Sequence, residues 1–284
     1  MSKTKLQRTH GQANSSNVPG GRDTGVTWID PAGNLWLFGG EGLGGPFPGC
    51  GCNSTGGFLA DLWRYDPRAN VWTWMSGSSL GSAAGGARGV YGTQGVPAAS
   101  NAPGHRIQAV SWTDPAGNLW LFGGNGFDSN GNEGQLNDLW KYDTTNGQWA
   151  WMSGSPIGNA PAVYGTQGVP AANVPDARQL AISWADKDSN LLLFGGSAES
   201  GNHNDLWQYT IGTGEWTWMS GSSGVNAPGI YGTLGPPAVT NVPGARAGGV
   251  SWIDASGKLW HFGGNGVDSG GVTDLLNDLW AYQR

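Results

Sequence analysis

One arginine and one aspartate recur at fixed positions along the chain, and together they could form either an anion site or a repeated salt bridge. Each arginine lies 17 residues before the first glycine of a Gly-Gly pair, and each aspartate begins an Asp-Leu-Trp triplet. These residues are Arg22, Arg106, Arg178 and Arg246, with Asp61, Asp138, Asp205 and Asp278. Identical use in all four copies favours a structural role, in which each arginine bonds to main-chain carbonyls or to the aspartate of the repeat.

Two cysteines, Cys50 and Cys52, are separated by one glycine. A metal site would need further ligands, and the sequence offers no set of Cys and His residues with zinc spacing. We interpret the pair as a strained local disulfide or two free thiols, and we predict no metal and no cofactor.

The segment from Asp128 to Glu133 alternates oxygen ligands in the manner of a calcium loop. It lacks the full twelve-residue loop that ends in a bidentate glutamate, and the segment from Asp268 to Gly271 is a poorer match. We therefore predict polar hairpin loops at both places. No catalytic residue is predicted, since no Ser/His/Asp order, phosphate loop or paired-carboxylate motif stands out.

A ligand would need residues that the repeat does not already use. All 17 Trp lie at repeat positions, so we expect most of them in the core. Three phenylalanines lie outside the repeat pattern and could stack on a sugar. Together with polar loop residues they form our set of ligand-binding candidates: Phe47, Phe58, Phe127, Asp128, Asn130, His203 and Asp268.

The elements that must position these residues are four copies of one Trp-rich unit, at about 18–101, 102–173, 174–241 and 242–284. Each copy is predicted to form four short strands. In the second copy the later three are Leu119 to Phe122, which ends at Gly-Gly, then Asp138 to Tyr142, then Trp149 to Met152. The fourth copy has no Trp-x-Trp-Met segment. Residues 1–17 are interpreted as a linker end or as a closing strand within 3–9.

Composition narrows the classes of partner. The chain holds 52 Gly and only 12% charged residues, which indicates many turns around an aromatic core. The net charge is −6 without a basic cluster, so we do not expect a nucleic-acid partner. No apolar run reaches the length of a membrane span, and residues 1–12 show no signal peptide. The low charge and the abundance of Gly, Asn, Ser and Trp favour a secreted or cell-surface bacterial protein.

The order Arg, Leu-x-Leu-Phe-Gly-Gly, Asp-Leu-Trp-x-Tyr-Asp and a Trp eleven residues later resembles the Kelch repeat over residues 18–284. This resemblance implies an all-β propeller of four-stranded antiparallel blades. The copies exceed the usual repeat length of about 50 residues because their linkers are long. Galactose-oxidase-like members of this group hold copper with Tyr and His. Here each Tyr is a repeat residue and the four His (His10, His105, His203 and His261) share no motif, so no copper is expected.

Function is expected where the copies differ most, between Gly-Gly and Asp-Leu-Trp, in residues 41–60, 125–137, 197–204 and 265–277. In four-stranded antiparallel blades these loops share one face, and binding residues tend to lie on loops over a rigid scaffold. The leading interpretation is a non-enzymatic binding or scaffold propeller with a protein or surface partner. The alternative is a carbohydrate-binding or sugar-active propeller, such as a lectin or a mutarotase. A third is a structural array that self-associates.

Overall fold

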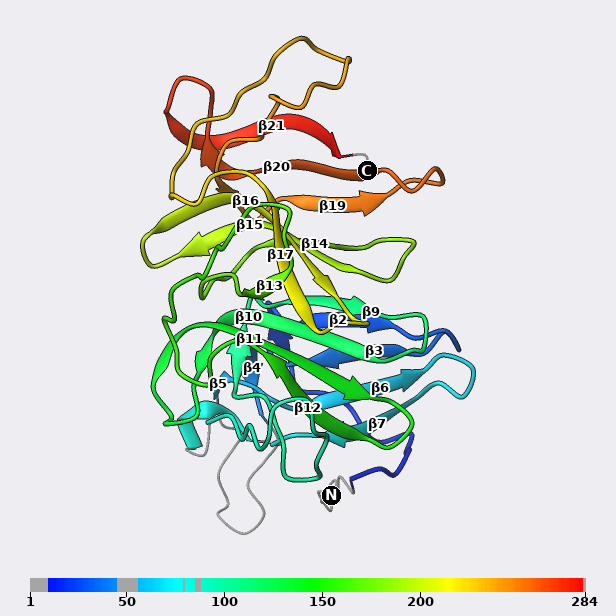
Figure 1. Ribbon diagram of the computed structural model, residues 1–284. Helices are drawn as coiled ribbons and strands as arrows, with labels where there is room; N and C mark the ends of the chain where they lie inside the picture. Colours follow the sequence, from blue (N-terminus) through cyan, green and yellow to red (C-terminus); the bar gives the residue numbers. More distant parts are fainter. Residues whose placement is uncertain (1–9, 45–55, 79, 85–87, 283–284) are drawn as a thin grey trace. The chain divides into compact units, whose positions relative to one another are not determined.

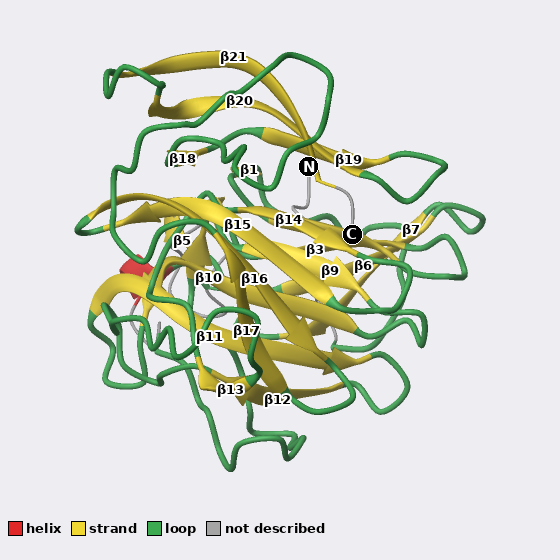
Figure 2. Cartoon of the chain, turned by 45° about the horizontal axis from the view of Figure 1, so that its top comes forward, coloured by secondary structure: helices red, strands yellow, loops and turns green. Residues whose placement is uncertain are grey.

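The computed structural model describes residues 10–44, 56–78, 80–84 and 88–282 as an all-β chain (Figures 1 and 2). In this described part the only helix is a 3₁₀ turn, η1 (Ser82–Ala84), and the strands form five sheets. This turn has neither the length nor the apolar character that a helix needs to cross a bilayer. The sheets are open, and their antiparallel pairing is consistent with the blades of a β-propeller.

The chain divides into two compact units, which are described separately. Unit 1 comprises Met1–Gly134, Leu139–Met152 and Pro156–Gly158, and unit 2 comprises Gln135–Asp138, Ser153–Ser155 and Asn159–Arg284.

Unit 1 contains most of the sheets of the first two copies. The sheet of copy 1 has the order β2-β3-β6-β7, formed by β2 (Val26–Ile29), β3 (Leu35–Phe38), β6 (Leu62–Asp66) and β7 (Val71–Ser76). The sheet of copy 2 consists of β8 (Arg106–Ile107), β9 (Val110–Thr113), β10 (Leu119–Phe127), β11 (Glu133–Asp143) and β12 (Gln148–Ser153). A small third sheet consists of β1 (Arg22–Asp23), β4 (Glu41–Leu43) and β5 (Gly56–Phe58).

Unit 2 contains the sheets of the last two copies. The sheet of copy 3 consists of β14 (Ile182–Ala185), β15 (Leu191–Ala198), β16 (Gly201–Thr210) and β17 (Glu215–Ser220), with β13 (Ala171–Asn173) parallel to β17. The sheet of copy 4 consists of β18 (Arg246–Ala247), β19 (Val250–Ile253), β20 (Leu259–Val267) and β21 (Thr273–Tyr282). Among the described residues β21 pairs with β20 alone.

In copies 2 to 4 the second strand continues through the Gly-Gly pair, whereas the sequence predicts that it ends there; in copy 1, β3 ends at Phe38 as predicted. In β10, Gly123 and Gly124 have φ of 65° and 93°, which favour glycine over other residues. The strand pairs with β9 before these glycines and with β8 after them. The expected loop at 125–137 is therefore largely strand, and 197–204 and 265–277 also lie mostly in strands.

Tryptophans contribute many of the largest side chains of the core, and ten of the 17 are buried. In unit 1 the indole of Trp28 donates from Nε1 to the carbonyl of Trp120 in the next sheet, at 3.0 Å. In unit 2, Trp184 donates in the same way to Trp260 at 3.0 Å. The repeated first-strand tryptophan thus joins consecutive sheets by a hydrogen bond as well as by apolar packing.

A second tryptophan position is fixed by the turn that precedes it. Asp30 accepts the Nε1–H of Trp36 at 2.9 Å, and its other oxygen accepts main-chain N–H groups of its own turn. Asp114 and Asp254 accept from Trp120 and Trp260 at 2.9 and 2.8 Å. The turn aspartate therefore sets the indole orientation of the following strand.

His261 makes the stability of the chain sensitive to acid. It is 3% exposed and stacks on Phe194, and burial together with the charge of Arg246 lowers its pKa to about 4. The unfolded chain then binds a proton that the folded chain does not, so stability falls as pH decreases from about 6.5 towards 4. We expect this difference in proton binding to make the free energy of unfolding about 2 kcal/mol lower at pH 5 than at pH 7.

The measurement is chemical unfolding at both pH values for the wild type and for His261→Leu. Copies 1 to 3 carry leucine at this position, as in Leu121 and Leu193, so the variant restores the repeat residue. The variant should lose less stability between pH 7 and pH 5 than the wild type, and an equal loss in both proteins would contradict the assignment.

Candidate functional site

Each repeat arginine is anchored to its own Gly-Gly pair. Nη1 of Arg22, Arg106, Arg178 and Arg246 donates to the carbonyl of the first glycine 17 residues later, at 2.8–3.2 Å. Both Nη atoms also bind the repeat aspartate, as Arg22 binds Asp61, Arg178 binds Asp205 and Arg246 binds Asp278. These arginines are committed to protein groups, and Asp138 is likewise fully buried.

The linker of each copy is the segment before its repeat arginine; in copies 2 to 4 this segment begins after the Trp-x-Trp-Met strand of the preceding copy. A tyrosine from this linker completes the arginine–aspartate cluster. The hydroxyl of Tyr164 donates to Asp205 at 2.7 Å, and that of Tyr231 donates to Asp278 at 2.6 Å. Burial and the negative charge of Asp205 raise the pKa of Tyr164 above its ordinary value. Burial alone would raise the pKa of Asp205, but Arg178 and its hydrogen bonds hold it below the usual range. The clusters are therefore ionised pairs capped by a neutral hydroxyl.

Copy 3 departs from the other copies inside this cluster. Asp176 stands where they have glycine, and His203 stands where they have leucine. His203 Nε2 lies 2.6 Å from an oxygen of Asp176, and Nε of Arg178 donates to the same carboxylate at 2.7 Å. His203 is 2% exposed, so this candidate for the ligand face is a buried member of the Arg178 cluster. Sequence reasoning missed the pair, although comparing the copies position by position reveals both replacements.

Two of the ligand candidates lie together in unit 1. The rings of Phe58 on β5 and Phe127 on β10 meet edge to face with centroids 6.0 Å apart, and both are partly exposed. Asn125 lies two residues before Phe127, on the same side of β10, and its amide donates to Glu133 at 3.3 Å. Aromatic rings beside amide and carboxylate groups are typical of a site that takes an amphipathic small ligand.

His105 connects the two phenylalanine-bearing strands from behind. Its Nδ1 lies 2.8 Å from the carbonyl of Phe58, and its own carbonyl accepts the N–H of Phe127 at 2.9 Å. Since a carbonyl can only accept, Nδ1 carries the proton and Nε2 is a buried acceptor, to which none of the described residues donates a hydrogen bond. Burial lowers the pKa of His105, which keeps the ring neutral. No motif marks this histidine, but its copies have Gly21, Ala177 and Ala245 at the same position.

The acidic candidates close hairpin turns. Asp128 is 1% exposed and accepts the N–H groups of Asn130 and Asn132 at 2.8 and 2.9 Å, so its carboxylate is occupied. Asp268 accepts from Gly270 and Val272 at 2.8 and 2.9 Å. Asn130 itself is exposed at the hairpin tip. Across the described residues no three His, Cys, Asp or Glu side chains gather as metal ligands.

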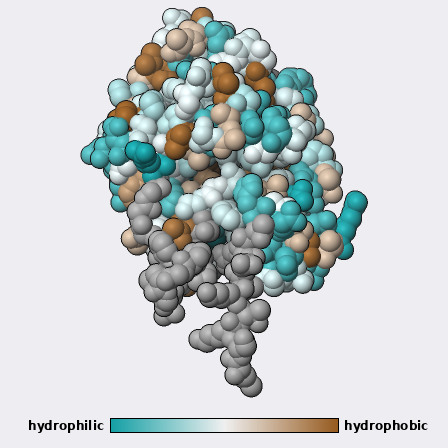
Figure 3. Space-filling view, turned by 90° about the horizontal axis from the view of Figure 1, so that it is seen from below, coloured by the Kyte–Doolittle hydropathy of each residue, from teal (hydrophilic) through white to brown (hydrophobic). Residues whose placement is uncertain are grey.

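Three sequence candidates lie outside the described residues, namely Phe47, Cys50 and Cys52. In the view of Figure 3 the apolar residues of the described surface are separated by hydrophilic ones, so no broad apolar patch is visible there.

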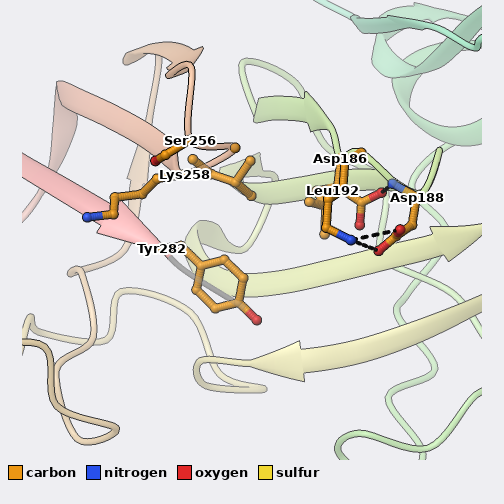
Figure 4. Close-up of a pocket in the computed structure, with 9 residues that line it drawn as sticks. Asp186, Asp188, Leu192, Ser256, Lys258 and Tyr282 are labelled. Carbon is orange, nitrogen blue, oxygen red and sulfur yellow. Dashed lines mark hydrogen bonds and ion pairs between the residues drawn. The ribbon is translucent and has the colours of Figure 1, made fainter.

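A shallow cavity of about 120 Å³ in unit 2 lies where the sequence of copy 3 differs from that of the other copies (Figure 4). It lies between the turns at Asp186 and Ser256, next to Leu192 and Tyr282. Leu192 replaces the tryptophan of the other copies. In unit 1 the corresponding Trp36 packs on Tyr142 with ring centroids 5.8 Å apart. The smaller leucine therefore leaves a gap beside Tyr282, and we interpret the cavity as a packing difference.

No family model matches the chain. Two curated proteins of the same name are 29% identical to it over 212 residues, namely Multiple epidermal growth factor-like domains protein 8 of Homo sapiens and of Mus musculus. The match covers 73% of this chain, and the chain spans about 6% of the length of these curated relatives.

Among solved structures, the chain is similar to YjhT with a TM-score of 0.50 and 16% sequence identity. The similarity covers 86% of this chain and 60% of the YjhT chain. At this identity the likeness bears on the fold alone, and it supports a Kelch-type β-propeller-like architecture.

Proposed function

We propose that the chain binds carbohydrate through the paired rings of Phe58 and Phe127 in unit 1. The observation that carries this proposal is their edge-to-face contact at 6.0 Å, formed by two partly exposed rings that the repeat core does not use. Kelch-type propellers, which the repeats resemble, include sugar-active proteins. This favours a sugar ligand over a protein scaffold as the leading function.

The chemistry of the proposed site suits a sugar in two ways. The exposed parts of the two rings offer an apolar surface for the C–H groups of a pyranose, and Asn125 and Glu133 offer amide and carboxylate groups for its hydroxyls. His105 fixes the separation of the rings through its bonds to both strands. We assign no catalytic step to this site, and a secreted or cell-surface location is part of the same proposal.

The test is a glycan array probed with the full chain, followed by titration calorimetry of the strongest hit. We expect saturable binding, and Phe127→Ala should weaken it about tenfold, which corresponds to about 1.4 kcal/mol. Val96→Ala is the matched control, since Val96 is 50% exposed and lies outside the proposed site. If no glycan binds, or if Phe127→Ala binds as tightly as the wild type, the proposal is wrong.

A protein-binding scaffold is the second candidate, favoured by one observation in unit 2. Four apolar residues of the copy 4 sheet are 42–60% exposed, and they are Val250, Trp252, Phe262 and Leu279. Their equivalents in the copy 3 sheet, Ile182, Trp184, Phe194 and Leu206, are 2–7% exposed. Saturable glycan binding that depends on Phe127 separates the leading function from this one.

A further inference from the structure

The outer edge of β21 has no strand beside it among the described residues (Figure 1). In the sheets of copies 1 to 3 the third strand of the repeat pairs with a fourth, as β6 pairs with β7 and β16 with β17. In each of these pairs, two tryptophans at alternate positions of the fourth strand lie opposite the third strand. For example, Trp216 lies opposite Tyr209 and Trp218 opposite Trp207. The edge of β21 presents the equivalent residues, Trp280 and Tyr282.

A linker holds each of these fourth strands from its other side. A linker glycine donates its N–H to the carbonyl of the second tryptophan at 2.7–2.8 Å, as in Gly11 to Trp74, Gly95 to Trp151 and Gly168 to Trp218. A linker asparagine donates its side-chain N–H to the carbonyl of the first tryptophan at 3.0–3.4 Å, as in Asn17 to Trp72, Asn101 to Trp149 and Asn173 to Trp216. The chain thus contains the same strand-binding contact three times.

The linker of copy 4 presents the same groups without a strand. Asn241 corresponds to Asn173, and none of the described residues forms a hydrogen bond with its side chain, whose Oδ1 is buried. This linker loops out beyond β21 in Figure 1. Tyr231 lies on Trp280 with ring centroids 5.0 Å apart, matching the 5.1 Å between Tyr164 and Trp207.

The aromatic side chains of this empty position are already in their binding arrangement. In copy 3, the first tryptophan of the fourth strand lies 5.2 Å from Tyr209, and the second lies 5.0 Å from Tyr164. Tyr231, the equivalent of Tyr164, is 36% exposed and is held by its hydrogen bond to Asp278. Little rearrangement is needed for a strand to bind, which lowers the entropic cost of association.

We propose that this slot, lined by Tyr231, Asn241, Trp280 and Tyr282, binds an extended strand of a partner that carries tryptophan at alternate positions. Strand addition to the edge of β21 supplies main-chain hydrogen bonds, and the alternate tryptophans fill the places between Tyr231 and Tyr282. The site is independent of the sugar site proposed in unit 1.

The test uses the full chain and a fluorescently labelled peptide that copies residues 214–221, Gly-Glu-Trp-Thr-Trp-Met-Ser-Gly. We expect saturable binding with one peptide per chain, measured by fluorescence anisotropy. A control peptide of the same composition, with the order Glu-Thr-Trp-Trp-Met, points its two indoles to opposite faces of a strand and should bind at least about tenfold more weakly.

Two variants of the chain locate the site. Asn241→Ala removes one donor and should weaken binding about 2–10-fold, the value of one hydrogen bond. Thr240→Ala, at an exposed neighbouring position, should leave binding unchanged. Equal binding of both peptides, wild-type affinity in Asn241→Ala, or no saturation at about 1 mM peptide would overturn the proposal.

Discussion

Replacement of Asp205 by alanine is expected to lower the free energy of unfolding by about 3–5 kcal/mol. It removes the bidentate partner of the buried Arg178 guanidinium, which then keeps only Asp176 as its counter-ion. It also leaves the donors of Tyr164 and Trp207 without their acceptor. The side chains of Arg178 and Asp205 are both fully buried, and their closest N–O distance is 2.6 Å. The same carboxylate accepts from Tyr164 and from the indole of Trp207 at 2.7 Å. Urea denaturation followed by tryptophan fluorescence measures the loss.

Asp188→Ala is the matched control for this prediction. Asp188 pairs with Lys187 at 2.9 Å, but both side chains are more than half exposed. Exposed pairs contribute about 0–1 kcal/mol, so this variant should unfold almost as the wild type does. The double variant Arg178→Met, Asp205→Leu should recover much of the stability lost in Asp205→Ala, since it removes the buried guanidinium together with its partner and leaves Asp176 beside His203. A loss below about 1 kcal/mol in Asp205→Ala would contradict the prediction.

Replacement of Gly124 by alanine is expected to cost about 3 kcal/mol or more, since strain and a steric clash act together. Its φ of 93° is unfavourable for any residue with a Cβ, and a Cβ there would lie 2.4 Å from the carbonyl oxygen of Ile107. That oxygen belongs to the main chain of β8, so relief requires the strand to move. Thermal and chemical unfolding of the variant measure the cost.

Gly212→Ala is the control for Gly124→Ala. A Cβ at Gly212 meets no atom within 4 Å, and its φ is not in the left-handed region. This control should therefore change stability by no more than about 0.5 kcal/mol. Comparable stability of the two variants would show that the bend at Gly-Gly tolerates a side chain.

Much of the architecture can be predicted from the repeat spacing, because repeated residues make contacts within their own copy. The interval of 17 residues between arginine and glycine corresponds to a hydrogen bond in all four copies, for example from Arg178 to Gly195. The alternation in Trp-x-Trp-Met and the apolar run Leu119 to Phe122 likewise become paired strands. These patterns predict strands well because side-chain direction and hydrogen bonding repeat together.

The candidate site was less predictable, because it depends on residues that only the fold brings together. Phe58 and Phe127 were singled out as aromatics outside the repeat, but their contact requires two sheets to lie side by side. His105 has no motif, and its role comes from two main-chain bonds. The pairing of Asp176 with His203 joins residues 27 positions apart, and only the comparison between copies marks them.

The sequence predicts longer loops after Gly-Gly than the structure has in copies 2 to 4, and the reason lies in the backbone. The predicted strand ends at the glycine pair, but the positive φ of Gly123 and Gly124 is matched by another at Gln108, in the bend between β8 and β9. The hairpin bends at this point and resumes pairing with β8. Composition alone does not distinguish such a bulge from a turn.

The tyrosine of each linker has a consequence for how the protein is made. Tyr164 precedes Asp205 in the chain and Tyr231 precedes Asp278, so on the ribosome each hydroxyl emerges before the carboxylate that it will cap. The polar cluster of a sheet contains no residue from a later repeat. The apolar face of the sheet depends on a later repeat, because Trp184 donates a hydrogen bond to the carbonyl of Trp260. All groups of the charged cluster are therefore available once its own repeat is synthesised, whereas the apolar face lacks its hydrogen-bond acceptor until the next repeat leaves the exit tunnel.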